Sequence, residues 1–226
     1  MSNQYNRLSS KNCKEVLMQI YKNRYFTNHG PLTQQFESEL ETFLNVSNAV
    51  TIMNNTLAIM VAMSGSYSGK KVAILSGCEK DVLDAVNISN VDFVNTTIDN
   101  LATESLSSIG MLVVSSNTLT KDNSVFLKGL EEKGITVIIC YLSISDFHYR
   151  ENFESVISVY SLGWGTLVQG GIITTDDDNL AEIFRNIRSS YGARKAMKVK
   201  ATCNGRFSEI QAGIGLNLLN KIKECI

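Results

Sequence analysis

The sequence has 226 residues, 44% of them hydrophobic, with 21 basic and 22 acidic side chains. This size and composition allow one domain with a substantial core, and the balanced charge excludes a general attraction to nucleic acid or to an anionic membrane. No apolar run is long enough to span a bilayer. Five widely spaced cysteines without a CxxC pair, and an N-terminus without a secretion signal, indicate reduced thiols in the cytoplasm.

Seven short apolar segments have the length and residue types of β-strands. They cover residues 49–53, 71–75, 91–94, 111–115, 135–141, 156–161 and 171–175. Several are continuously apolar, which is typical of strands covered on both faces. We therefore expect one α/β domain over residues 1–226, a three-layer sandwich around a seven-stranded, mainly parallel sheet.

Segments with helical periodicity lie between these strands. In the first, Thr33 is the expected N-cap of a helix that carries Phe36, Leu40, Phe43 and Leu44 on one face. A second covers residues 125–130, and Gly134 is its expected C-cap. A third is expected to begin at Asp178 and to end at Gly192, and a fourth covers residues 208–221.

The sequence Asn54-Asn55-Thr56 follows a predicted strand and opens a helix. The free N–H groups at a helix N-terminus can bind a phosphate, and Thr56 adds a hydroxyl group. Asparagine is also one of the best N-cap residues, a role that needs no ligand. The motif by itself leaves both interpretations open.

Two glycine-rich segments, residues 163–166 and Gly170-Gly171, follow the strand that ends at Ser161. Paired glycines allow the backbone to approach a ligand closely, but a hairpin or bulge uses the same residues more often. No Walker lysine follows, and no G-x-G-x-x-G opens a helix. Nucleotide binding through these two motifs is therefore disfavoured.

Two polar groups give weaker indications. Six cations without an intervening acid could bind a diphosphate or an acidic partner, although a solvated helix face is favoured; they are Arg185, Arg188, Arg194, Lys195, Lys198 and Lys200. Tyr141, Asp146 and His148 follow the most hydrophobic strand at the edge where parallel sheets bind ligands, but their spacing is common in loops.

Taken in chain order, several segments resemble the DegT/StrS family of sugar-nucleotide aminotransferases. They are residues 24–41, 49–58 and 170–176, and most specifically residues 204–216, Asn-Gly-Arg-Phe-Ser-Glu-Ile-Gln-Ala-Gly-Ile-Gly-Leu. The family reads Asn-Tyr-Arg-Met-Ser-Glu-Ile-Gln-Ala-Ala-Ile-Gly-Leu there. The resemblance is strong over residues 24–63 and 156–222, and only positional between them.

The resemblance implies a fold type I pyridoxal-phosphate (PLP) domain in a homodimer with active sites at the interface. In the family, the turn that matches Asn54, Asn55 and Thr56 holds the cofactor phosphate together with a serine that matches Ser161. An asparagine that matches Asn204 reaches the phosphate from the neighbouring subunit.

The sequence departs from the family pattern at three places. Thr166 stands where the family lysine forms the Schiff base, and no lysine occurs between Lys133 and Lys195. Cys140 stands where the family aspartate pairs with the pyridine nitrogen, and a neutral thiol cannot hold that proton. The sequence also ends where the family's small C-terminal domain would begin.

We therefore expect a degenerate member of the family with no catalytic residue, no metal and no cofactor. It would bind a nucleotide sugar or phosphate, or pair as a homodimer or as a heterodimer with a related aminotransferase, in sugar or polysaccharide biosynthesis. One alternative is an active PLP-dependent sugar-nucleotide aminotransferase. Another is a different enzyme that reuses the pocket, with Tyr141, Asp146 or His148 as acid or base.

Overall fold

The computed structural model describes residues 9–103, 106–120, 122–146, 157–162, 168–189 and 193–225. The strands are β1 (Asn48–Ile52), β2 (Lys71–Leu75), β3 (Phe93–Thr96), β4 (Ile109–Ser115), β5 (Thr136–Tyr141), β6 (Ile157–Ser161) and β7 (Gly171–Thr175). The helices are α1 (Ser10–Asn23), α2 (Pro31–Leu44), α3 (Asn55–Ser66), α4 (Lys80–Ser89), α5 (Ile98–Thr103), α6 (Asn123–Glu132), α7 (Asp178–Arg188) and α8 (Glu209–Lys223). Short 3-10 turns, η1 (Leu106–Ser108) and η2 (Ser116–Thr118), flank β4.

The seven strands form one sheet in the order β1-β7-β6-β5-β4-β2-β3. Strands β3, β2, β4, β5 and β6 pair in parallel, whereas β7 is antiparallel to both β6 and β1. The mainly parallel sheet is therefore confirmed. Because β7 reverses direction between them, β1 and β6 run the same way and their carboxyl ends meet at one edge.

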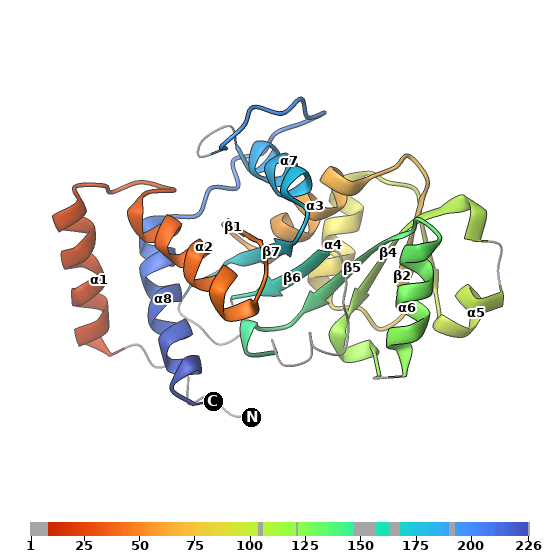
Figure 1. Ribbon diagram of the computed structural model, residues 1–226, viewed down its shortest axis with the longest axis horizontal. Coiled ribbons are helices and arrows are strands. Elements are labelled where there is room, and N and C mark those ends of the chain that lie inside the picture. Colours follow the sequence, from red (N-terminus) through yellow and green to blue (C-terminus); the bar gives the residue numbers. More distant parts are fainter. Residues whose placement is uncertain are drawn as a thin grey trace.

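Helices cover both faces of the sheet (Figure 1). Side chains of α3, α4 and α7 form one apolar cluster with alternate residues of the strands. Those of α1, α2, α5, α6 and α8 form a second cluster with the remaining strand residues. Cys140 belongs to the first cluster and Tyr141 to the second, as expected for adjacent residues of a strand. The three-layer α/β sandwich is confirmed.

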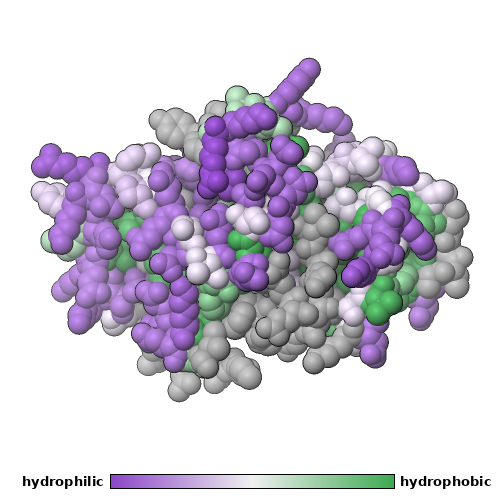
Figure 2. Space-filling view, in the orientation of Figure 1, coloured by the Kyte–Doolittle hydropathy of each residue, from purple (hydrophilic) through white to green (hydrophobic). Residues whose placement is uncertain are grey.

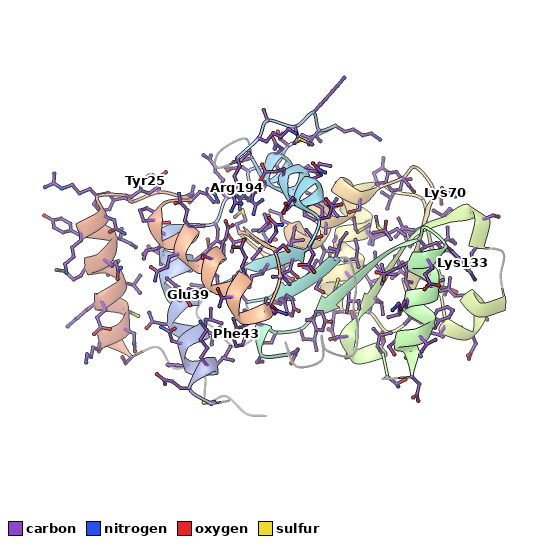
Figure 3. All side chains as sticks on the ribbon, viewed as in Figure 1. Tyr25, Glu39, Phe43, Lys70, Lys133 and Arg194 are labelled. Carbon is purple, nitrogen blue, oxygen red and sulfur yellow. The ribbon has the colours of Figure 1, made fainter. Side chains whose placement is uncertain are left out.

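Helix α8 packs against both α1 and α2, and small residues make the close approach possible. A Cβ atom on Gly213 would lie 2.4 Å from Val16 Cγ1, and one on Gly215 would lie 2.6 Å from Phe36 Cζ. At the other end of α8, Lys223 Nζ lies 2.6 Å from the carboxylate of Glu39. Figure 3 labels Glu39 on α2. Gly213 and Gly215 therefore allow α8 to pack closely against α1 and α2.

Two predicted N-caps are wrong. Helix α2 begins at Pro31 with Gly30 as N-cap, and Thr33 lies buried in the first turn. Thr33 is not needed as a cap because the Glu209 carboxylate accepts the N–H groups of Gly30, Leu32 and Thr33 at 2.9 to 3.0 Å. Helix α7 is capped by Asp177, one residue before the predicted Asp178.

Of the two predicted helix ends, the one at Gly134 is confirmed and the one at Gly192 is wrong. Gly134 follows the C-cap residue of α6 and has a φ of 78°, a conformation that suits glycine at the end of a helix. Helix α7 ends at Arg188, earlier than predicted, and Gly192 lies outside the described residues.

The basic stretch is not one solvated face. Arg185 Nη1 lies 2.8 Å from Glu182 Oε1, and Arg188 Nη1 lies 2.9 Å from Glu37 Oε1, with both guanidinium groups buried. The four later cations, Arg194, Lys195, Lys198 and Lys200, are exposed. The face seen in Figure 2 is largely hydrophilic around α1, α2 and α7. No helix of the described ranges is long and apolar enough to cross a membrane.

Candidate functional site

The carboxyl ends of the parallel strands bring the predicted phosphate-binding residues to one edge of the sheet. Asn54 comes two residues after the end of β1, and Ser161 ends β6, which runs in the same direction. Ligands of parallel sheets bind at this edge. The sheet topology therefore brings together two segments that are more than 100 residues apart in the sequence.

Asn54 caps helix α3. Its Oδ1 accepts the N–H of Leu57 at 2.8 Å, and its carbonyl oxygen accepts the N–H of Ala58 at 3.1 Å. Within the described part of the chain, the N–H groups of Asn55 and Thr56 have no hydrogen-bond acceptor. The capping interpretation therefore holds for Asn54, and two N–H donors remain that an anion could accept.

A pocket with a volume of about 410 Å³ opens beside this end of α3. We call it the α3 pocket. Its walls come from α3, α4, the end of β6 and the segment before β7, and they comprise Asn54, Asn55, Thr56, Leu57, Met60, Asp81, Ile88, Ser161, Gln169 and Gly170. Four of the five residues predicted to hold a cofactor phosphate, Asn54, Asn55, Thr56 and Ser161, therefore line one cavity.

Close backbone packing holds the walls of the α3 pocket in place. A Cβ atom on Gly171 would lie 2.4 Å from Ala58 Cβ and 3.0 Å from the Asn54 carbonyl oxygen, so only glycine lets β7 approach α3 this closely. From α8, Gln211 Nε2 donates to the carbonyl oxygens of Met53 at 2.9 Å and Gln169 at 2.6 Å. Gly171 is thus both the first residue of β7 and the position where the β7 backbone packs directly against α3.

Cys140 lies buried at the end of β5, opposite Ser115 of β4 and Val159 of β6. Burial strongly raises the pKa of this thiol, and the nearby Cys78 and Asp81 raise that pKa further. The Cys140 side chain is therefore neutral at physiological pH and places no negative charge at this edge of the sheet.

Asn204 does not join the α3 pocket within the described chain. Its side chain is exposed, and its Oδ1 accepts a hydrogen bond from Arg206 Nε at 2.9 Å. The predicted role of Asn204 across a subunit interface stays a prediction.

Of the alternative acid-base residues, Tyr141 and Asp146 lie within the described ranges, and both make structural contacts. Tyr141 stacks on Tyr160, with ring centroids 4.6 Å apart, in the apolar cluster on the sheet face opposite Cys140. The Oδ2 atom of Asp146 accepts the N–H of Ser143 at 3.0 Å, a local turn contact. His148, Trp164 and Thr166 lie outside the described residues.

Asp81 is the pocket residue that sequence reasoning missed. It lies in the first turn of α4, and its Oδ2 accepts a hydrogen bond from Asn55 Nδ2 at 2.9 Å. An acid in the first turn of a helix is ordinary because it suits the helix dipole, so the sequence carried no signal of a ligand-facing role.

The described residues fit one end of a pyridoxal-type cofactor. Two N–H groups at the start of α3 and the hydroxyl groups of Thr56 and Ser161 suit its phosphate. The neutral thiol of Cys140 does not match the protonated ring nitrogen, because it offers no negative charge.

Comparison of the sequence with protein-family models finds the DegT/DnrJ/EryC1/StrS aminotransferase family, which matches residues 8–76 and 154–226. A search of curated proteins finds no match. The central segment without a family match contains β3, β4 and β5.

Solved structures share the fold. DesI, determined in the presence of its TDP-sugar product, superposes with a TM-score of 0.80 at 19% identity over 97% of this chain and 60% of its own. NtdA from Bacillus subtilis with bound PMP gives 0.74 at 17% identity, over 96% of this chain and 55% of its own. The E. coli GDP-4-keto-6-deoxy-D-mannose-3-dehydratase with bound hydrated PLP gives 0.78 at 13% identity, over 96% and 67%. The chain thus spans about 60% of the length of DesI and 55% of that of NtdA.

The expectation that no cofactor is involved is wrong. The family is one of aminotransferases, and two of the similar structures hold PMP or PLP, so the cofactor indicated is PLP. Thr166 and Cys140 match family residues that contact the cofactor's aldehyde and ring, and their loss does not by itself remove the contacts to its phosphate. The residues that match the family's phosphate contacts, Asn54, Asn55, Thr56 and Ser161, line the α3 pocket. By the family match over both ends of the sequence and the shared fold, this chain belongs to the DegT/DnrJ/EryC1/StrS aminotransferase family.

Proposed function

We propose that this chain binds a pyridoxal-type cofactor in the α3 pocket and acts on a sugar nucleotide, as a PLP-dependent member of its aminotransferase family. The observation that carries the proposal is the α3 pocket itself. It combines two N–H donors of α3, for which the described chain supplies no acceptor, with Thr56 and Ser161 at the carboxyl edge of the sheet. Membership of the family supports the same cofactor.

Each pocket residue has a distinct role in this proposal. The N–H groups of Asn55 and Thr56 bind the phosphate oxygens, and the hydroxyl groups of Thr56 and Ser161 add donors. Gln211 joins Met53, the residue before Asn54, to Gln169 of the pocket wall. A pyridoxal-type cofactor supplies an electron-withdrawing ring when it is bound.

The proposal includes reversible attachment of the cofactor. No lysine occurs between Lys133 and Lys195, so the connection from β6 to β7 supplies no amine for covalent attachment. The phosphate contacts therefore carry the binding. Because Cys140 is neutral, the ring nitrogen has no anionic partner on β5.

Binding of pyridoxamine 5′-phosphate, measured by isothermal titration calorimetry, tests the proposal. We expect saturable binding that dialysis reverses, and a roughly 3- to 10-fold weaker affinity for Thr56→Val, which removes one hydrogen bond to a charged group. Thr42→Val is the control, because Thr42 occupies an exposed position of α2 and its hydroxyl group donates locally to the carbonyl oxygen of Ser38. Absence of binding, or equal affinity in Thr56→Val and the wild type, would contradict the proposal.

The catalytic part of the proposal has its own measurement. The protein with bound pyridoxamine 5′-phosphate is incubated with a keto sugar nucleotide, and the amino sugar is sought by mass spectrometry. Formation of the amino sugar supports action on sugar nucleotides. Binding without any product would restrict the function to cofactor or ligand binding.

We also propose that the chain pairs with a second copy or with a related aminotransferase, so that Asn204 contributes to the neighbour's pocket. The exposed position of Asn204 outside its own α3 pocket favours this reading. Light scattering should then find a dimer, or a heterodimer after mixing with a relative. Asn204→Ala should weaken cofactor binding, whereas Asn87→Ala, at an exposed position of α4, should not. A chain that stays monomeric alone and in mixtures would contradict this proposal.

A further inference from the structure

Among the described residues that line the α3 pocket, Asp81 is the single charged side chain. It projects from the first turn of α4, a helix that packs beside α3 on the same face of the sheet. No lysine or arginine of the described chain lines the pocket to offset it. The pocket proposed to hold a phosphate therefore also contains a negative charge.

The hydrogen bond between Asn55 and Asp81 determines which groups the wall offers. Asn55 Nδ2 donates to Asp81 at 2.9 Å, so this amide donor is already used. Asn55 Oδ1 is buried and has no partner within the described residues. Asn54 Oδ1 is used as well, by the N–H of Leu57. On the Asp81 side, the side chains present acceptors, while the donors come from the backbone of α3.

A ligand has to match both halves of this arrangement. A phosphate group suits the N–H donors at the start of α3, but a bare phosphate dianion would also be repelled by the Asp81 carboxylate. A ligand that carries an ammonium group or hydroxyl donors close to its phosphate would offer favourable partners to Asp81 and to Asn55 Oδ1.

We propose that Asp81 sets the charge selectivity of the α3 pocket, favouring a phosphate ester with a nearby ammonium or hydroxyl donor over inorganic phosphate. This inference rests on the proposed cofactor site and specifies its ligand class. Asp81 acts here as a specificity-determining residue. A purely structural role, in which Asp81 only ties α4 to α3 through Asn55, predicts a different outcome.

The test compares three probes on the full chain by calorimetry: inorganic phosphate, pyridoxamine and pyridoxamine 5′-phosphate. Asp81→Asn removes the charge and keeps an oxygen that can accept from Asn55. Asp84→Asn is the matched control, because it removes the same charge three residues along α4, where Asp84 pairs with Lys80 outside the pocket.

In Asp81→Asn, inorganic phosphate should bind roughly 3- to 10-fold more tightly, and pyridoxamine more weakly by a similar factor, as removal of one nearby charge predicts. In Asp84→Asn, both affinities should stay within about twofold, because exposed charges are screened. Opposite shifts for the two probes are the signature of charge selectivity.

Asp81→Asn affinities that change equally for both probes, or not at all, would overturn the inference. Thermal unfolding of each variant identifies a damaged fold, in which case Asp81→Ser provides the same charge removal. If the wild type binds pyridoxamine 5′-phosphate and Asp81→Asn shows no opposite shifts in its affinities for phosphate and pyridoxamine, the cofactor site stands and the inference fails. If phosphate and pyridoxamine shift in opposite directions in Asp81→Asn but pyridoxamine 5′-phosphate binds to neither protein, the inference stands and the cofactor proposal fails. Absence of binding in every protein would overturn both.

Discussion

Two polar regions of this molecule differ in how their hydrogen-bonding groups are paired. The first, which we call the Arg188 network, joins Arg188, Glu37, His29 and Thr51 and lies buried between α2, β1 and α7. The second is the α3 pocket, which lies open at the edge of the sheet. In the network, one oxygen of Glu37 accepts from Thr51 N, Thr51 Oγ1 and Arg188 Nη1 at 2.8 to 2.9 Å. In the pocket, polar atoms of Asn55 and Thr56 have no protein partner in the described ranges.

The difference separates groups that stabilise the fold from groups that, in the proposed function, bind a ligand. Buried charges are tolerated only when they are paired and hydrogen-bonded, so each member of the Arg188 network depends on the others. An open pocket tolerates free donors because water can satisfy them until a ligand binds. Substitutions should therefore cost folding stability in the network and binding affinity in the pocket.

The largest effect is expected for Arg188→Leu. This change leaves the buried Glu37 without its cation, which should lower the free energy of unfolding by about 3 to 5 kcal/mol. Urea unfolding followed by circular dichroism measures the loss. Lys11→Met is the control, because the Lys11–Glu15 pair is largely exposed and contributes little. A loss below that of an ordinary surface substitution would show that the network does not hold these elements together.

The pH dependence of stability should reveal His29. Burial and then the neighbouring Arg188 hold the pKa of His29 below its ordinary value of 6.5, although Glu37 opposes them. The unfolded chain therefore binds the proton more readily, and stability should fall as the pH drops below about 6.5, by at most about 1.4 kcal/mol per pH unit.

His29→Asn should remove this slope, since asparagine tolerates the φ of 60° at this position. Burial alone would raise the pKa of Glu37, but Arg188, His29 and the bonds to Thr51 bring it below its ordinary value of 4.5. The stabilisation from Glu37 is thus present above pH 4.5 and is lost only at lower pH. Urea unfolding between pH 5 and 7 tests His29 separately from Glu37. Equal slopes of the free energy of unfolding against pH in the wild type and His29→Asn would refute the assignment of this dependence to His29.

The smallest effect is expected for Asn54→Ala at the pocket. Loss of the N-cap of α3 should lower the free energy of unfolding by about 1 kcal/mol, far less than the change at Arg188. Cofactor affinity should fall as well, because the first turn of α3 presents the phosphate donors. Asn87→Ala, on an exposed position of α4, controls for loss of an asparagine. Unfolding losses as large as that of Arg188→Leu would erase the distinction between the two regions.

Much of the fold could be predicted because its strands are marked by local apolar runs. Residues 71–75 and 171–175 were predicted with the observed bounds, and β3 lies two residues later than predicted because it is a partly exposed edge strand with a weak pattern. Helices α1, α4 and α5 were not predicted. The burial of Arg185 and Arg188 was also missed. Arg185 pairs with Glu182 one turn earlier in α7, and Arg188 pairs with Glu37 on α2, far away in the sequence.

The sequence alone determined the strand pattern, the family motif in residues 204–216, and the absence of a lysine between Lys133 and Lys195. These features are local, so neighbouring residues suffice to define them. Only the tertiary structure decided that Ser161 joins the start of α3, that Arg188 pairs with Glu37, and that Asp81 lines the pocket. The reason is that strand order and helix packing bring together residues far apart in the sequence, and no local pattern records those contacts.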